Sequence, residues 1–114
     1  MGKFNERERP FMDRLLLELR DRLVHLGVEV HHLSDQDNRP CLEVFDKNLR
    51  CRRVYAHLAF MWFFWGSDNS ERYSCHDLED AAEVIAAAAQ AGWPLEEQGH
   101  LGPDLQKILD AYPS

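Results

Sequence analysis

This 114-residue chain has six histidines and three cysteines, the residue types that could bind a metal ion such as zinc. Zinc needs several ligands that converge on one point, and structural sites usually pair ligands about two to four residues apart. His31 and His32 are neighbours in a segment that reads as a strand, so their side chains point to opposite faces. Cys41 and Cys51 could approach each other across a hairpin, and only its register decides whether they do. Because the spacing of zinc ligands is absent, we expect no metal and no cofactor.

Cys75-His76-Asp77 contains the residue types of a nucleophile, a base and an orienting acid. Catalytic triads are assembled in space from separated positions, because adjacent side chains cannot align as attacker and base. Asp77 instead has the position of a helix N-cap. The adjacent acids Glu96 and Glu97 fall in a predicted loop. The sequence therefore indicates no catalytic residue, and we expect that the protein is not an enzyme.

Arg50, Arg52 and Arg53 form a basic cluster beside an aromatic segment, a combination that can bind single-stranded nucleic acid. The formal net charge of -7 and a pI near 5.3 argue against a protein that mainly binds phosphate backbones. No glycine-flanked RNA-binding signature accompanies the arginines. A nucleic-acid partner is therefore not expected, and a solvated strand face or a salt bridge to a protein partner is the favoured interpretation.

The run Phe60-Met61-Trp62-Phe63-Phe64-Trp65, followed by Gly66, is the most unusual segment of the chain. Read as a strand, it places three bulky apolar side chains on each face of a sheet. Helices normally cover one face of such a small sheet and the other face is exposed to solvent. Apolar and polar side chains then alternate along each strand. Three such side chains left open would form an apolar patch of roughly 500 Å², at or above what a typical monomer exposes. We expect a partner, most simply a second copy of the chain, to cover the second face.

The elements that position these residues follow from the apolar periodicity. Residues 10–26 repeat leucines at helical spacing and Gly27 ends that helix. Alternating segments from Val28 to Ser74 predict four or five strands joined by short turns, with the turn before the aromatic strand near residues 56–59. An alanine-rich helix is expected from Asp77 to Ala91, and a short amphipathic helix from Pro103. This order predicts an α+β two-layer sandwich: an N-terminal helix, an antiparallel meander and C-terminal helices.

The expected organisation is one α+β domain at residues 10–92, between a flexible N-terminus at 1–9 and a C-terminal extension at 93–114. Hydrophobic and charged contents of 45% and 29% are typical of soluble globular proteins. The longest apolar run, residues 58–66, is about half the ~20 residues that span a bilayer, and the charged start does not resemble a signal peptide. The odd number of cysteines without a CxxC pair fits a reducing compartment. We expect a cytoplasmic protein without membrane association.

Four segments carry a resemblance to known proteins: residues 15–27, 39–44, 62–66 and 80–85. In composition and order they resemble a group of small actinobacterial α+β proteins of uncharacterised function. The architecture is also similar to type III secretion chaperone-like sandwiches. That second resemblance implies a sheet face used for dimerisation or for holding partner segments, and it implies no catalytic residue.

These observations favour a small protein–protein interaction module, accessory or chaperone-like, that dimerises or docks a protein partner through its aromatic sheet face. The predicted interface residues are Phe60, Met61, Trp62, Phe63, Phe64 and Trp65, with Arg50 and Arg52 as rim charges. A slip of one residue in register would exchange the three that face outward. The alternative is a small-ligand-binding protein or enzyme whose aromatic strand lines a pocket with polar groups from Tyr55, His57, Tyr73 and Cys75.

Overall fold

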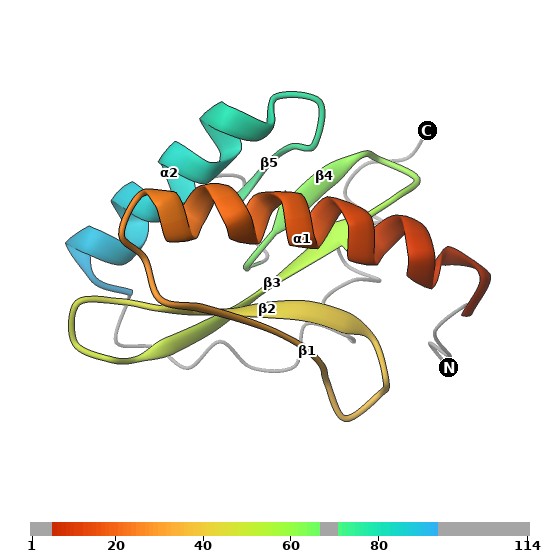
Figure 1. Cartoon of the computed structure of the whole chain (residues 1–114), viewed down its shortest axis with the longest axis horizontal. Helices are drawn as coiled ribbons and strands as arrows, with labels where there is room; N and C mark the ends of the chain where they lie inside the picture. The colour runs from red at the N-terminus through yellow and green to blue at the C-terminus, as the bar shows by residue number, and fades with distance from the viewer. Residues whose placement is uncertain (1–5, 67–70, 94–114) are drawn as a thin grey trace.

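A computed structural model describes residues 6–66 and 71–93 (Figure 1). A 3-10 turn, Glu6–Glu8, leads into helix α1, Arg9–His25, so the helix begins one residue before the expected Pro10. Within the described ranges the sheet has five strands and a second helix follows it: β1 Val30–Ser34, β2 Pro40–Phe45, β3 Cys51–His57, β4 Trp62–Phe64, β5 Arg72–Ser74 and α2 Leu78–Ala91. The sheet is antiparallel in the order β1-β2-β3-β4-β5. The predicted α+β class, with an N-terminal helix, a meander and a C-terminal helix, is confirmed.

Helix α1 packs on the sheet through the predicted apolar stripe, in which Met12, Leu16, Leu19 and Leu23 are all buried. The helix ends at His25, and Gly27 follows with a φ of 85°, the left-handed conformation that glycine adopts without strain. The amide of Val28 donates back to the Leu23 carbonyl at 3.0 Å, which closes the last turn and places Val28 in the core.

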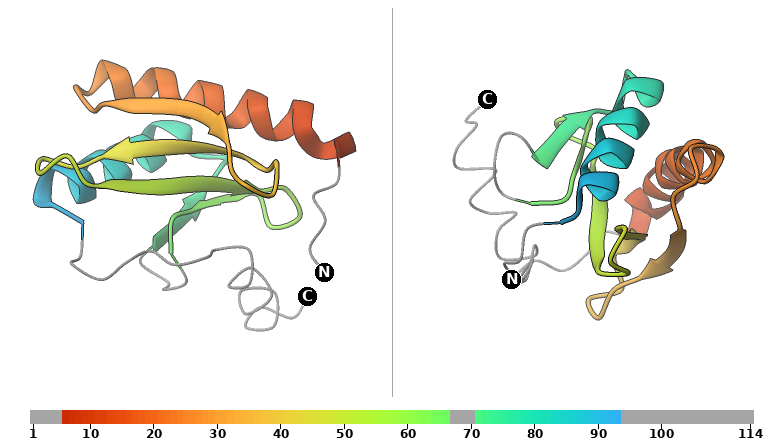
Figure 2. Two further views of the ribbon diagram at one scale, coloured as in Figure 1. Left: turned by 90° about the horizontal axis from the view of Figure 1, so that it is seen from below. Right: turned by 90° about the vertical axis from the view of Figure 1, so that its left-hand side faces the viewer.

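Helix α2 presents alanines such as Ala82 and Ala89, together with Ile85, to the same core. Both helices lie on one side of the sheet (Figure 2). The alanine face lets α2 pack closely on the sheet and against α1. Asp77 occupies the predicted N-cap position, but its side chain makes no capping hydrogen bond. The Asp77 carboxyl instead hydrogen-bonds that of Asp80 and raises the Asp80 pKa above its usual range.

Alternation along the strands separates a helix-covered face from an opposite face. On β2 and β3 the pairs Leu42–Val54 and Val44–Arg52 point toward the helices. The helix-covered core also takes Ala56, which pairs with Phe63 of β4. The intervening residues, which include Tyr55 on β3, point to the opposite face.

Three turns connect β1 to β4, and each ends on a residue with positive φ. These residues are Asn38, Leu49 and Met61, with φ of 65°, 63° and 52°. In each turn the amide of that residue donates to the carbonyl three positions earlier, as Met61 does to Leu58 at 3.2 Å. The turn before β4 therefore spans residues 58–61, about two positions later than expected. The sequence did not mark it because neither Gly nor Asn occupies its left-handed position.

Trp93 fixes the end of α2 to the β2–β3 hairpin. Its amide donates to Asp46 Oδ2 at 2.9 Å, and its indole Nε1 donates to the Val44 carbonyl at 3.1 Å. The Trp93 carbonyl in turn accepts from Arg50 Nη2 at 2.7 Å. The predicted C-terminal extension, apart from Trp93, and its helix from Pro103 lie outside the described residues, as do residues 1–5.

Candidate protein-interaction surface

The six-residue aromatic run is only partly a strand. Trp62–Phe64 form β4, whereas Phe60 and Met61 belong to the preceding turn. The ladder continues on either side, because the Trp65 amide donates to the Glu71 carbonyl and the Cys75 amide to the Met61 carbonyl, both at 2.9 Å. The predicted alternation is kept, so successive side chains still point to opposite faces.

The register decides which of the six side chains the helices cover. Phe63 and Trp65 are buried in the core shared by both helices, and Met61 packs against that core. Trp62 and Phe64 point to the opposite face, where Phe64 is 2% exposed and Trp62 is half-buried. Three of the six, Phe63, Phe64 and Trp65, are thus buried within one chain. The other three, Phe60, Met61 and Trp62, all stay half-buried.

Stacked and tilted rings organise the surface around the β3–β4 turn. The His57 imidazole stacks on Phe60, with ring centroids 4.6 Å apart and planes 17° apart. The Phe60 and Trp62 rings are 4.9 Å apart at 48°, and Tyr55 stacks on Phe64 at 5.6 Å. We call these five residues (Tyr55, His57, Phe60, Trp62 and Phe64) the aromatic surface. Aromatic pairs of this geometry contribute about 0.5–1.5 kcal/mol beyond the area that they bury, so the rings stabilise one another's positions.

Strand β5 adds a cation to this surface. The Arg72 guanidinium lies over the Trp62 ring, 4.8 Å from its centroid. Arg72 pairs with Phe64 and Ser74 pairs with Trp62, so Arg72 and Ser74 share the face of the aromatic surface. The arginine was not singled out by sequence reasoning, because only the β4–β5 register brings it diagonally across from Trp62.

A hollow of about 560 Å³ opens beside Trp62 at this edge of the sheet. Turn and strand side chains of both faces, together with the helix cap residue, form its walls: Phe60, Met61, Trp62, Arg72, Tyr73, Ser74 and Asp77. All three of the predicted interface residues that remain half-buried therefore line one cavity. Its volume is in the range of ligand-binding clefts, and its walls combine aromatic rings with a cation and a carboxylate.

Two members of the aromatic surface, Tyr55 and Phe64, also belong to a small apolar cluster on the same face. Cys41, Tyr55 and Phe64 are buried together, and Leu33 and Trp62 pack at its edge. The Tyr55 hydroxyl donates to Asp35 Oδ2 at 2.7 Å. Burial raises the pKa of the Cys41 thiol to about 12 and also raises that of Tyr55. Neither group ionises near neutral pH, so their roles here are packing and hydrogen bonding.

The two predicted rim arginines lie elsewhere. Arg52 points to the helix-covered side, where its buried guanidinium donates to Glu71 at 2.7 Å and to the Trp65 carbonyl at 3.4 Å. Arg50 pairs with Asp46 at 3.4 Å beside Trp93. Both arginines therefore form ion pairs and hydrogen bonds that join segments of the same chain. Arg72 is the cation that borders the aromatic surface.

The candidate metal-binding residues are dispersed. His32 meets Asp13 of α1 at 2.9 Å on the helix side, whereas His31 meets Glu29 at 3.1 Å, as expected for opposite faces. Cys51 pairs with Phe45, four positions from Cys41, so the hairpin does not oppose the two cysteines. In residues 6–66 and 71–93, no three His, Cys, Asp or Glu side chains gather as they would around a metal ion.

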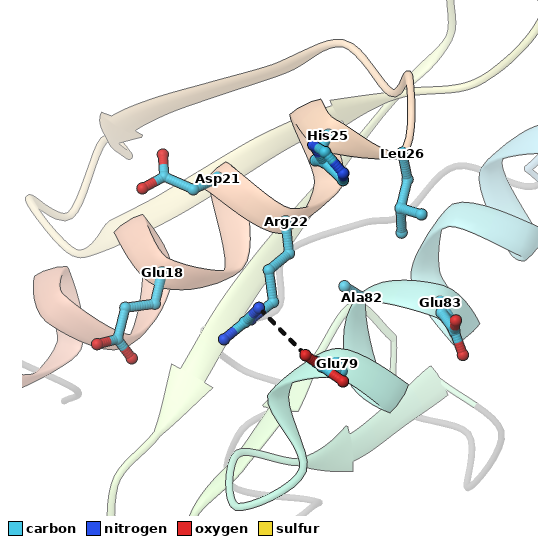
Figure 3. Close-up of a pocket in the computed structure, with 8 residues that line it drawn as sticks. All are labelled: Glu18, Asp21, Arg22, His25, Leu26, Glu79, Ala82 and Glu83. Atoms are coloured by element: carbon cyan, nitrogen blue, oxygen red, sulfur yellow. Dashed lines mark ion pairs between the residues drawn. The ribbon is translucent and has the colours of Figure 1, made fainter.

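A second hollow of about 550 Å³ runs between the two helices on the far side of the sheet (Figure 3). Its only ion pair among the residues drawn joins Arg22 to Glu79 at 3.7 Å. The remaining walls combine the carboxylates of Glu18, Asp21 and Glu83 with His25, Leu26 and the buried Ala82. Charged rows of this kind are typical of solvated helix faces, and such exposed pairs contribute little to stability.

Neither helix of the described part of the chain has both the length and the apolar character needed to cross a bilayer. Comparison of the chain with models of protein families, with curated proteins and with solved structures gave no match. The resemblance to small actinobacterial proteins and to secretion chaperones therefore stays a prediction.

Proposed function

We propose that this chain is a small protein–protein interaction module that binds a second copy of itself, or another protein, through the aromatic surface. The observation that carries the proposal is the ordered group of Phe60, Trp62 and Arg72 beside a hollow at the sheet edge. Aromatic and arginine side chains are the types that dominate binding energy at protein interfaces. Their ring contacts fix them in advance, which lowers the entropy lost on binding.

The surface extends beyond the hollow along the same face of the sheet. Leu33 of β1 and Phe45 of β2 are half-buried on this face, and His31 meets the Phe45 ring edge-on at 5.5 Å. A stable interface buries roughly 800 Å² on each partner, more than the aromatic surface alone can supply. Contact that extends across β1 to β5 would add Leu33 and Phe45 to the buried surface, and a twofold dimer would use the same face on both partners.

Analytical ultracentrifugation of the whole chain and of Phe60→Asp tests the proposal. Phe60 lies in a turn and is half-buried, so a carboxylate there can reach solvent in the monomer but not in the interface. The matched control is Phe11→Asp, because Phe11 is 64% exposed on α1. We expect the wild type and Phe11→Asp to associate and Phe60→Asp to be monomeric. A monomeric wild type, or a Phe60→Asp variant that stays dimeric, would contradict homodimerisation through this face.

The alternative, a small-ligand-binding protein or enzyme, is favoured by the hollow itself. Its walls carry Arg72, Ser74 and Asp77 beside the Trp62 ring, which are polar groups able to orient a ligand. A thermal-shift screen with metabolites and metal ions tests this function, because ligands that bind only the folded state raise the Tm. A shift that Trp62→Ala abolishes would support it, and no shift across the screen would count against it.

A further inference from the structure

The imidazole of His57 holds the turn that carries the aromatic surface. His57 ends β3, and its Nδ1 accepts a hydrogen bond from the Phe60 amide at 3.2 Å. The same ring stacks on the Phe60 side chain at 4.6 Å. One side chain therefore fixes both the backbone and the ring of Phe60. Because the Phe60 amide is a donor, Nδ1 must be unprotonated in this arrangement.

The surroundings of His57 are mostly aromatic. Its ring centroid lies 6.2 Å from that of Trp62 and 6.4 Å from that of Phe64. Burial among these rings disfavours the charged form and outweighs a hydrogen bond to the His57 backbone that favours it, so the pKa of His57 lies below its ordinary value. Two charged groups face it from other elements: Glu8 before α1 favours the imidazolium, and Arg39 before β2 disfavours it. The imidazole is therefore neutral at neutral pH.

We propose that His57 is a pH-operated latch of the aromatic surface: the neutral imidazole holds the turn at residues 58–61 in its binding conformation, and protonation releases it. The link to binding rests on the proposed function of this surface. A proton on Nδ1 would turn the acceptor into a donor that faces the Phe60 amide, so the hydrogen bond is lost. Phe60 and Met61 then lose a support of the turn in which Met61 has a positive φ.

The direction of the pH effect follows from the lowered pKa. The unfolded chain takes up the proton near pH 6.5, before the folded chain does, so acidification through that range destabilises the latched state. The destabilisation of the latched state is complete once the pH falls below the pKa of His57 in the folded chain. Association through the aromatic surface should then weaken roughly tenfold, the factor given by loss of about one hydrogen bond.

NMR spectroscopy of the isolated protein tests the latch without any partner. Between about pH 8 and pH 4.5, a range that brackets the histidine pKa, the Phe60 amide resonance should move with the same midpoint as the His57 ring signals. His57→Asn supplies an oxygen at the position of Nδ1 that does not titrate, so the Phe60 amide shift should become independent of pH. The control His31→Asn removes an exposed histidine of the same sheet and should leave the Phe60 titration unchanged.

A Phe60 amide that does not follow the His57 titration, or one that keeps its pH dependence in His57→Asn, would overturn the latch. Sedimentation at about pH 7.5 and pH 5, on either side of the histidine pKa, then tests the link to binding. Association should weaken at the lower pH in the wild type and not in His57→Asn. A chain that is monomeric at both pH values would contradict the proposed dimer, while the Phe60 titration would still decide the latch.

Discussion

Asp35 and Asp46 make the same hydrogen bonds in two successive hairpin turns. Each Oδ1 accepts the amides two and four residues ahead: Asp37 and Arg39 at 2.9 Å for Asp35, and Asn48 and Arg50 at 2.8 Å for Asp46. Each Oδ2 accepts from a distant aromatic residue, the Tyr55 hydroxyl at 2.7 Å or the Trp93 amide at 2.9 Å. A single carboxylate thus shapes each turn and joins it to another part of the fold.

Replacing Asp46 by Asn should lower the Tm more than replacing Asp35 by Asn. Asp46 is buried, and its side chain also accepts a hydrogen bond from the Trp93 amide at the end of α2. The Asp35 side chain accepts one from the Tyr55 hydroxyl, on the face of the sheet opposite the helices. Three backbone amides and Arg50 outweigh burial and lower the pKa of Asp46. Its carboxylate therefore stabilises the fold above the ordinary pKa of about 3.9, and that contribution is lost as the pH falls toward the lower folded value.

Thermal unfolding from about pH 6 down to pH 2.5, which spans the carboxyl pKa, measures this contribution. The Tm of Asp46→Asn should fall less steeply on acidification than that of the wild type. Equal slopes for the two proteins would contradict the assignment. Asp35→Asn serves as the matched turn variant.

Replacing Leu49 by Asn should stabilise the protein by about 1 kcal/mol, because left-handed backbone is costly for residues other than Gly, Asn and Asp. Leu49 has a φ of 63° and is 75% exposed, so it gains little from packing. Asn38 occupies the equivalent position of the preceding turn with a φ of 65°. Urea unfolding measures both this change and the reverse substitution Asn38→Leu, which should cost a similar amount. A destabilised Leu49→Asn would show that the Leu49 side chain is needed elsewhere.

Replacing Gly66 by Ala should destabilise the fold by roughly 1–3 kcal/mol, the range for a disturbed hydrogen bond to a buried charged group. A Cβ at Gly66 would clash with Cδ of Glu71, whose carboxylate accepts a hydrogen bond from the buried Arg52 guanidinium. The added methyl must displace that carboxylate. A double-mutant cycle with Glu71→Gln should give a total smaller than the sum of the two single effects. Additive effects would mean that the two residues act independently.

Replacing Phe63 by Ala should cost about 3–5 kcal/mol, the usual range for a fully buried phenylalanine. Phe60→Ala should cost much less, because Phe60 lies half-buried in the turn. Chemical denaturation of the two variants at low protein concentration compares the two faces of the aromatic segment directly. Equal losses would contradict the register in which Phe63 faces the helices and Phe60 does not.

The local elements were predictable because their signals are short-range. The leucine stripe before Gly27 and the alanine face before Gly92 predicted the bounds of both helices to within one or two residues. The turn at Asp46 followed from its Asp-Lys-Asn composition. The turn at residues 58–61 was misplaced because Met61 takes the left-handed position that a glycine or asparagine would normally mark.

The sequence alone determined that the segment from Phe60 to Trp65 has two bulky apolar faces, since alternation is a property of any extended chain. Only the tertiary structure decided that Phe63 and Trp65 face the helices and that Trp62 faces Arg72. The tertiary structure also places Arg52 in a buried ion pair with Glu71, whereas the sequence predicted it at the rim of an interface. The physical reason is register: which strand positions pair depends on the length and conformation of each turn, and these depend on contacts between residues far apart in the sequence.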